Sequence, residues 1–190
     1  VLEITNNGRT VTHTAQETHA VAFLKNNLSV GQRHIFEFEF HSVKSMAFFI
    51  GIICVQAKQS PKDLNLSQHL GQPIGAFNCG LNNYGYFWSS MCSSSFVKVT
   101  TPQDQWANVS QLWSSGDKMT MVIDMRQAKE TSKALCISYY KNKKLVYVNN
   151  EHSRFPADDE KIYAATSIHY ANDSLTVLPL SESVLDYITN

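Results

Sequence analysis

The stretch that decides the fold is Leu112–Val148, LWSSGDKMTMVIDMRQAKETSKALCISYYKNKKLVYV. Apolar side chains alternate with other residues in Lys118–Met125 and again in Leu135–Tyr140, and a period of two is typical of strands with one buried face. The polar segments 126–133 and 141–144 break the pattern and indicate a loop and a tight turn. The stretch therefore predicts an antiparallel meander of three strands. Its expected core-face residues are Met119, Met121, Ile123, Met125, Leu135, Ile137 and Tyr139.

Strand patterns continue on both sides of this meander. His34–Phe40 alternates phenylalanine with glutamate, so Phe36, Phe38 and Phe40 are expected to face the core. Met46–Val55 is continuously apolar and is typical of a central strand buried on both faces. Further short strands are expected at Tyr84–Trp88, Ile162–Tyr170 and Ser174–Leu178. Because no long helical period occurs, the sequence predicts an all-β fold with little helix, an antiparallel two-sheet sandwich.

Composition limits the classes of function. The 190 residues are 43% hydrophobic, which suits a single globular domain over 1–190. Sixteen basic and 16 acidic residues give a formal net charge of zero, which disfavours nucleic-acid and membrane-surface binding. The chain starts at Val1 rather than Met, so we expect it to be a piece of a longer protein, and we expect the domain to be monomeric.

Six segments in order resemble the SPRY domain family, whose fold is a concanavalin A-like, jelly-roll-like β-sandwich. The resemblance runs from about Thr5 to Pro179 and leaves 180–190 as a C-terminal tail. The segments that carry it are Gly31–Glu39 (GQRHIFEFE), Phe49–Ile52 (FIGI), Asn83–Tyr86 (NYGY), Ser115–Asp124 (SGDKMTMVID), Ile137–Asn142 (ISYYKN) and Ile162–Ser167 (IYAATS).

The chain departs from the family pattern in ways that mark it as divergent. Phe36 and Tyr84 stand where the family has tryptophan, and Ala164 stands where it has proline. The family's Asn-Gly turn is Asn142-Lys143 here. A type I′ turn would place Lys143 at positive φ, which costs a non-glycine residue about 1 kcal/mol, so Lys143→Gly is expected to stabilise the fold.

The resemblance implies a non-catalytic adaptor module that binds a peptide segment or loop of another protein in the cytoplasm. The implied surface lies at a strand end and is completed by loops, including the long polar loop Gln56–Gly75. The residues expected to contact the partner are His169, Tyr170, Asn172, His41, Lys44, Tyr84 and Leu70.

Two other functions remain open from the residues. A carbohydrate-binding lectin could use the same sandwich, with exposed aromatic side chains as sugar platforms. A glycoside hydrolase would need paired carboxylates, for which Glu37 and Glu39 are the candidates. Strand alternation favours a solvated face for these two glutamates, opposite the phenylalanines.

No cofactor or metal site is predicted. The seven histidines lack the H-x-H and H-x-x-x-H spacings of metal sites, and no phosphate-binding loop occurs. Cys54 and Cys136 lie in apolar strands and are expected to be buried thiols. Cys79 and Cys92 are expected to be reduced as well, with a disulfide between them as the alternative.

Overall fold

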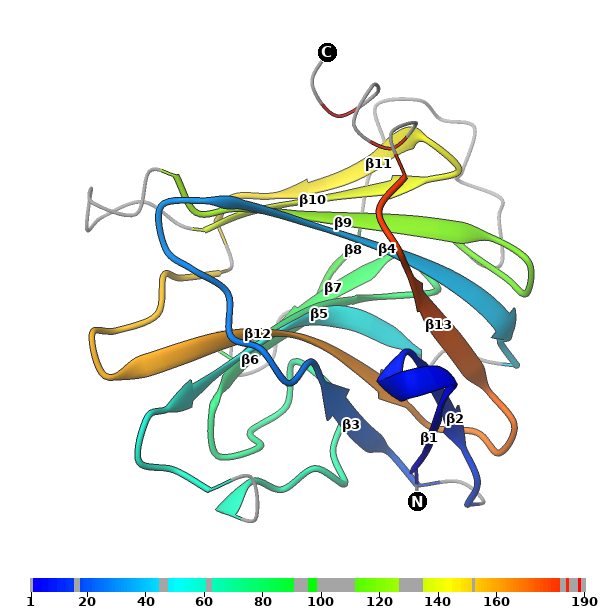
Figure 1. The fold of residues 1–190 in the computed structure, drawn as a ribbon, viewed down its shortest axis with the longest axis horizontal. Helices are drawn as coiled ribbons and strands as arrows, with labels where there is room; N and C mark the ends of the chain where they lie inside the picture. Colours follow the sequence, from blue (N-terminus) through cyan, green and yellow to red (C-terminus); the bar gives the residue numbers. More distant parts are fainter. Residues whose placement is uncertain are drawn as a thin grey trace.

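The computed structural model shows a sandwich of two antiparallel β-sheets (Figure 1). No helix in the described part of the chain is long and apolar enough to cross a bilayer. The described residues are 2–15, 18–44, 48–60, 63–90, 96–98, 112–126, 135–151, 153–181, 184 and 188.

The first sheet has seven strands in the order β1-β2-β13-β4-β9-β10-β11. Its edge hairpin, β1 and β2, is joined by a short 3-10 turn, η1, at Asn6–Gly8. The strands are β1 (Leu2–Thr5), β2 (Thr10–His13), β4 (Arg33–Ser42), β9 (Lys118–Asp124), β10 (Cys136–Lys141), β11 (Lys144–Asn149) and β13 (Ser174–Leu178).

The second sheet has six strands in the order β3-β12-β5-β6-β7-β8. Its strands are β3 (Ala20–Phe23), β5 (Phe49–Gln56), β6 (Phe77–Asn82), β7 (Tyr86–Ser89), β8 (Phe96–Lys98) and β12 (Glu160–Ile168). The predicted all-β, two-sheet antiparallel fold is therefore confirmed.

The meander predicted from Leu112–Val148 is present as β9, β10 and β11. Tyr139 lies opposite Met121 on one neighbour and opposite Tyr147 on the other. Every residue predicted for its core face is buried. Asn142 and Lys143, which join β10 to β11, have φ of 46° and 71°. Both values are positive, as a type I′ turn requires.

The main core fills the space between the sheets. Phe38 and Phe40 of β4 are buried as predicted, whereas Phe36 is only partly buried against this core. Trp113, fully buried beside Phe40 with ring centroids 5.5 Å apart, adds the largest side chain. Burial of these rings, together with the aliphatic side chains of the same core, favours the packing of the two sheets.

Strand β5 lies inside the second sheet, paired with β12 and β6, as its unbroken apolar run predicted. Gly51 is required there because the strands approach closely. A Cβ at Gly51 would lie 2.0 Å from the Cys79 carbonyl oxygen and 2.6 Å from the Gly80 Cα. Only a residue without a side chain fits at this position.

The long polar loop predicted at Gln56–Gly75 connects β5 to β6 and packs back on the second sheet. Leu64, Leu70 and Ile74 from this loop form a second apolar cluster with Ile53 and Phe49. Val21 of β3 donates its backbone N–H to the Leu66 carbonyl at 3.0 Å, which ties the loop to the edge of the sheet. The loop therefore covers the outer face of the second sheet with buried leucines.

Strand ends from both sheets meet at one end of the sandwich, which we call the loop end. β2, β4 and β12 end there, and β3, β5 and β13 begin there, on the right and lower right of Figure 1. Because consecutive antiparallel strands reverse at their connections, segments that are distant in sequence come together at this end.

Candidate functional site

The turn between β12 and β13 holds three of the predicted partner-binding residues: His169, Tyr170 and Asn172. Asn172 has φ of 70°, a left-handed conformation that asparagine tolerates better than most residues. Its N–H donates to the His13 carbonyl at 2.7 Å, and the His13 N–H donates to the Asp173 carbonyl at 2.9 Å. The turn is therefore held against the end of β2 by two backbone hydrogen bonds.

His41 at the end of β4 and Lys44 in the segment that follows it lie beside the same turn and the start of β13. Lys44 Nζ donates to the Ala171 carbonyl at 3.1 Å, and Lys44 N donates to Asp173 Oδ1 at 3.0 Å. His41 Nε2 is hydrogen-bonded to Thr176 Oγ1 on β13 at 2.7 Å. Since His41, Lys44 and Asn172 are all exposed, they form one polar surface on a fixed backbone.

Asp173 lies beneath this surface and joins the two segments that form it. Its side chain is buried and accepts hydrogen bonds from Lys44 N at 3.0 Å and from the Ser42 hydroxyl at 3.4 Å. Burial raises the pKa of the Asp173 carboxyl to about 6, although these hydrogen bonds and the nearby Lys44 charge act to lower it. The carboxylate therefore positions the β12–β13 turn against the segment that follows β4.

An aromatic cluster flanks the surface and links it to the long β5–β6 loop. The His19 ring lies 4.2 Å from that of His169 and 5.0 Å from that of His69, measured between ring centroids. His69 stacks on Phe49 at 4.7 Å, nearly parallel, and contacts Trp88 edge-on at 5.2 Å. Histidines distant in sequence therefore meet here, which no short spacing motif could indicate.

The cluster favours uncharged histidines. Burial, with the nearby His169 and His69 rings, lowers the pKa of His19 to about 4. Burial also lowers the pKa of His69, against the hydrogen bond between its Nδ1 and the Leu70 carbonyl. His19 and His69 are therefore neutral at pH 7 and present ring faces and edges rather than positive charge. The described residues contain no group of three or more His, Cys, Asp or Glu arranged to hold a metal ion.

Within the described part of the chain, no hydrogen bond or ion pair joins the remaining predicted residues, Tyr84 and Leu70, to this surface. Tyr84 is half-buried in the β6–β7 turn, where its N–H donates to Asn82 Oδ1 at 3.1 Å. The proposal that Leu70 contacts a partner is wrong, because its side chain is completely buried in the second apolar cluster. The loop packs back on the sheet through this leucine, so the polar composition of the loop did not reveal which of its residues are exposed.

We define the loop surface as His41, Lys44, His169, Tyr170 and Asn172. His169 and Tyr170 are half-buried, with ring centroids 4.5 Å apart in an edge-on contact. The sequence missed the support beneath this surface, namely Asp173, His69 and Trp88. An aspartate directly after an Asn turn and before a strand was the only local signal for Asp173.

The two candidate catalytic carboxylates do not share a cavity. Glu37 is buried, not solvated as the strand pattern predicted, and lines a polar depression with Lys118 and Thr120. Glu39, partly exposed, does not line that depression. This arrangement gives no support to a glycoside hydrolase built on this pair.

The described cysteines are free thiols. Cys54 and Cys79 are buried, and burial raises the pKa of Cys54 to about 12. Cys136 is also free and partly buried. Cys92 lies outside the described residues, but Cys79 is free in this structure, so the alternative of a Cys79–Cys92 disulfide is not supported. Burial raises the pKa of both Cys54 and Cys79, which makes these two thiols poor nucleophiles.

Comparisons with known proteins show which solved structures have a similar fold. No protein-family model matches the sequence, and no curated protein matches it. Solved structures do match. A human SPRY domain has a TM-score of 0.63 and 14% identity, covering 95% of this chain and 96% of its own. The SPRY domain of human HERC1 has a TM-score of 0.61 and 14% identity, covering 95% of this chain and 93% of its own.

A carbohydrate recognition domain is a weaker match. A variant of the Emp46p domain has a TM-score of 0.50 and 9% identity, covering 94% of this chain and 84% of its own. The two SPRY domains match the backbone of this chain along nearly its whole length. Their sequence identity of 14% is too low to assign a function to any single residue. The chain therefore has the fold of SPRY domains, a concanavalin A-like β-sandwich, at a sequence identity of 14% to each of these two structures.

Proposed function

We propose that the chain is a non-catalytic protein-interaction module that binds an extended segment or loop of a partner protein through the loop surface. The observation that carries this proposal is the meeting of exposed polar residues from two separate connections on one fixed backbone. Lys44 from the first connection is hydrogen-bonded to Ala171 in the second. Loops held by a rigid sandwich are the usual place for recognition in folds of this kind.

The chemistry of the loop surface suits a peptide better than a small reactive substrate. His41 and Asn172 offer hydrogen-bonding groups, and Lys44 offers a positive charge. Tyr170 adds an amphipathic ring of the type that carries binding energy at interfaces. Because Asp173 and the two backbone hydrogen bonds to His13 fix the turn, little conformational entropy would be lost on binding.

A peptide-display selection followed by measured affinities tests the proposal. Peptides that bind the 190-residue chain are selected, and the tightest is titrated against wild type, Lys44→Ala and Tyr170→Ala by calorimetry. Each substitution is expected to weaken binding at least tenfold. The matched control is Lys161→Ala, since Lys161 is an exposed lysine on β12 far from its loop-end terminus.

The variants and the Lys161→Ala control together show whether the peptide binds at the loop surface or elsewhere. Equal binding by wild type, Lys44→Ala and Tyr170→Ala, with melting temperatures unchanged, would place the peptide elsewhere on the sandwich. Weakening by Lys161→Ala alone would move the site to the opposite end. A variant that melts below the assay temperature is replaced by His41→Ala, which removes another exposed side chain of the loop surface.

The lectin alternative is supported by the similarity to the Emp46p carbohydrate recognition domain and by a half-exposed tyrosine beside Asn172. A glycan array probed with the chain distinguishes the two functions. We expect no sugar to bind in competition with the selected peptide. A glycan that binds and is lost in Tyr170→Ala would favour the lectin.

A monomeric module in the cytoplasm is part of the same proposal. The free thiols of Cys54, Cys79 and Cys136 are compatible with a reducing compartment. Sedimentation of the purified chain tests the first expectation, with a single species of the 21.4 kDa mass as the predicted result. Imaging of the tagged parent protein tests the second.

A further inference from the structure

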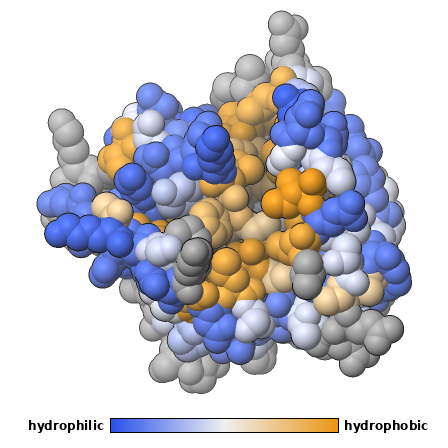
Figure 2. Space-filling view, turned by 60° about the horizontal axis from the view of Figure 1, so that its bottom comes forward, coloured by the Kyte–Doolittle hydropathy of each residue, from blue (hydrophilic) through white to orange (hydrophobic). Residues whose placement is uncertain are grey.

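A pocket opens between the two sheets at a lateral edge of the sandwich, away from the loop surface. One wall is the β1–β2 hairpin with β13 and β4, and the other is β3 with β12. Figure 2 shows the apolar hollow on this face, bordered by hydrophilic side chains on both sides. The pocket is open to solvent on one side and has a volume of about 210 Å³. We call this cavity the edge pocket.

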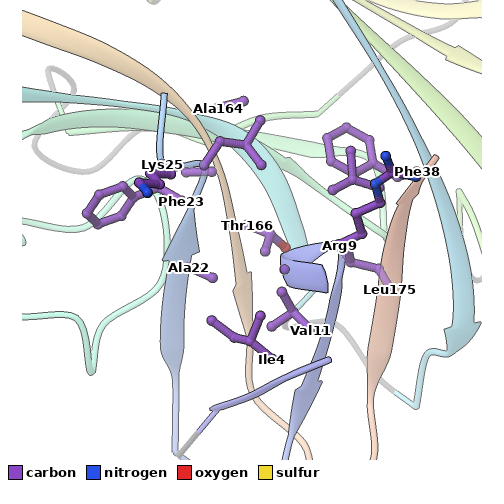
Figure 3. Close-up of a pocket in the computed structure, with 14 residues that line it drawn as sticks. Ile4, Arg9, Val11, Ala22, Phe23, Lys25, Phe38, Ala164, Thr166 and Leu175 are labelled. Atoms are coloured by element: carbon purple, nitrogen blue, oxygen red, sulfur yellow. The ribbon is translucent and has the colours of Figure 1, made fainter. Parts of the chain in front are cut away.

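The pocket exists because small side chains stand where the core elsewhere has large ones. Ala22 of β3 and Ala164 of β12 form much of one wall, and Val11 and Leu175 face them from the other (Figure 3). Elsewhere between the same two sheets the space is filled by large residues, among them Phe40, Phe48 and Trp113. The edge pocket is therefore apolar, and no side chain of the described residues fills it.

Two positive charges border this apolar space. Arg9 follows η1 on the hairpin wall, and Lys25 follows β3 on the opposite wall (Figure 3). Both residues are exposed, and the lining contains no Asp or Glu. Neither cation has an ion-pair partner among the described residues, although Asp124, Asp117 and Glu160 are paired elsewhere. The hydroxyl of Thr166, which also lines the pocket, donates to the Phe49 carbonyl at 2.8 Å.

We propose that the edge pocket binds a small anionic amphipath, a carboxylate with a short aliphatic tail. The tail would lie against Val11, Phe38 and Leu175, where burial of apolar surface is favourable. The carboxylate would lie at the mouth between the Arg9 guanidinium and the Lys25 ammonium, both of which donate only. The volume is below the about 300 Å³ at which sites for drug-sized ligands begin, which limits the tail to a short chain.

Amide chemical shifts of the ¹⁵N-labelled chain, titrated with three probes, test this proposal. Octanoate has the proposed head and tail, propionate has the head with little tail, and octylammonium has the tail with the opposite charge. We expect octanoate to shift the amides of Arg9, Lys25 and Ala164 saturably. Octylammonium and propionate are expected to bind at least tenfold more weakly.

Charge and volume variants test the two halves of the proposed site. Arg9→Gln and Lys25→Gln are each expected to weaken octanoate binding about fivefold or more, while Lys161→Gln leaves it unchanged. Ala22→Leu, which fills the pocket from a partly exposed position, is expected to abolish binding. If Ala22→Leu does not fold, the two exposed charge variants still decide.

Several outcomes would overturn the proposal. Absence of saturable shifts with octanoate below its micelle concentration would show that the pocket takes no such ligand. If octylammonium bound as tightly as octanoate, or if both charge variants bound octanoate with wild-type affinity, the pocket would bind apolar tails without a contribution from Arg9 and Lys25. Shifts confined to residues 41–44 and 169–173 would place the ligand on the loop surface instead.

Discussion

At the scale of single residues, backbone conformation and burial decide most effects. Lys143 was singled out in the sequence because a lysine stands where a type I′ turn favours glycine, and its φ of 71° confirms the reason. Asn142 in the same turn also has positive φ, but two side-chain hydrogen bonds offset the cost of this conformation. Its Oδ1 accepts from Lys118 N at 3.0 Å, and its Nδ2 donates to Asp117 Oδ1 at 3.0 Å. Lys143 is the strained member of the pair.

Lys143→Gly is expected to raise the free energy of unfolding by about 1 kcal/mol, because glycine adopts positive φ without steric cost. Urea unfolding measures the change. The control is Lys144→Gly, an exposed lysine at the start of β11, where glycine should destabilise the strand slightly. A loss of stability in Lys143→Gly would contradict this explanation.

Asp173→Asn is expected to stabilise the fold at pH 7.5 by about 1 kcal/mol and to have no such effect at pH 4. The folded carboxyl has its pKa raised to about 6 from an ordinary value of 3.8, so the folded state binds more protons between these two pH values. The cost of the buried charge is therefore present above pH 6 and absent below about pH 4. Asparagine keeps the acceptor for Ser42 and Lys44.

Thermal melts across pH measure this difference, with the exposed Asp159→Asn as control. A stabilisation that is equal at pH 4 and pH 7.5 would show that the buried charge is not its cause.

At the scale of elements, alternation predicted the strands, but not the contacts made by loops. β9 and β10 follow directly from the period of two in Lys118–Asp124 and Cys136–Lys141. The histidine contacts could not be predicted, because His19, His69 and His169 come from three separate connections and meet only after both sheets form. Leu70 was wrongly assigned to the binding surface because its burial, too, depends on how the β5–β6 loop packs on the finished sheet.

The aromatic cluster makes stability sensitive to acid. The pKa of His19 is lowered to about 4 in the folded state from 6.5, so the unfolded state binds more protons between these values. The contribution of neutral His19 to the free energy of unfolding is fully present above pH 6.5 and is lost as pH falls toward 4. His69 and His13 have lowered pKa values and act in the same direction, whereas Asp173 acts in the opposite one.

His19→Leu is therefore expected to lose less stability than wild type between pH 7 and pH 5, by about 1 kcal/mol after allowance for solvent screening. Urea unfolding at both pH values measures the difference. The control is the half-exposed His34→Leu, since the His34 ring lies outside the cluster and is hydrogen-bonded to the nearby Ser29 carbonyl. Equal losses in wild type and His19→Leu would remove the cluster as the cause.

Gly51→Ala should disrupt the second sheet. The new Cβ would lie 2.0 Å from the Cys79 carbonyl, a backbone atom that cannot move without breaking the β5–β6 pairing. We expect a loss of at least about 3 kcal/mol, measured by chemical denaturation. Gly31→Ala, with φ of 86° and open space around it, should cost only about 1 kcal/mol. Similar losses for the two would argue against the close approach.

At the scale of the whole molecule, the sequence predicted the architecture better than the site. Six segments in order resembled SPRY domains, and the two-sheet sandwich matches solved SPRY domains over 95% of the chain. Of the predicted site residues, His41, Lys44, His169, Tyr170 and Asn172 meet at the loop end, because strand reversals place their segments side by side. The edge pocket arises where small residues from both sheets face each other, which no single segment reveals.

We propose that this sandwich recognises a protein segment at its loop end. Hydrogen exchange of the chain, with and without a selected peptide, tests it most directly. We expect slowed exchange within 41–44 and 169–173, with 153–160 at the opposite end unchanged. Protection confined to that opposite end, or to the outer face of either sheet, would contradict it.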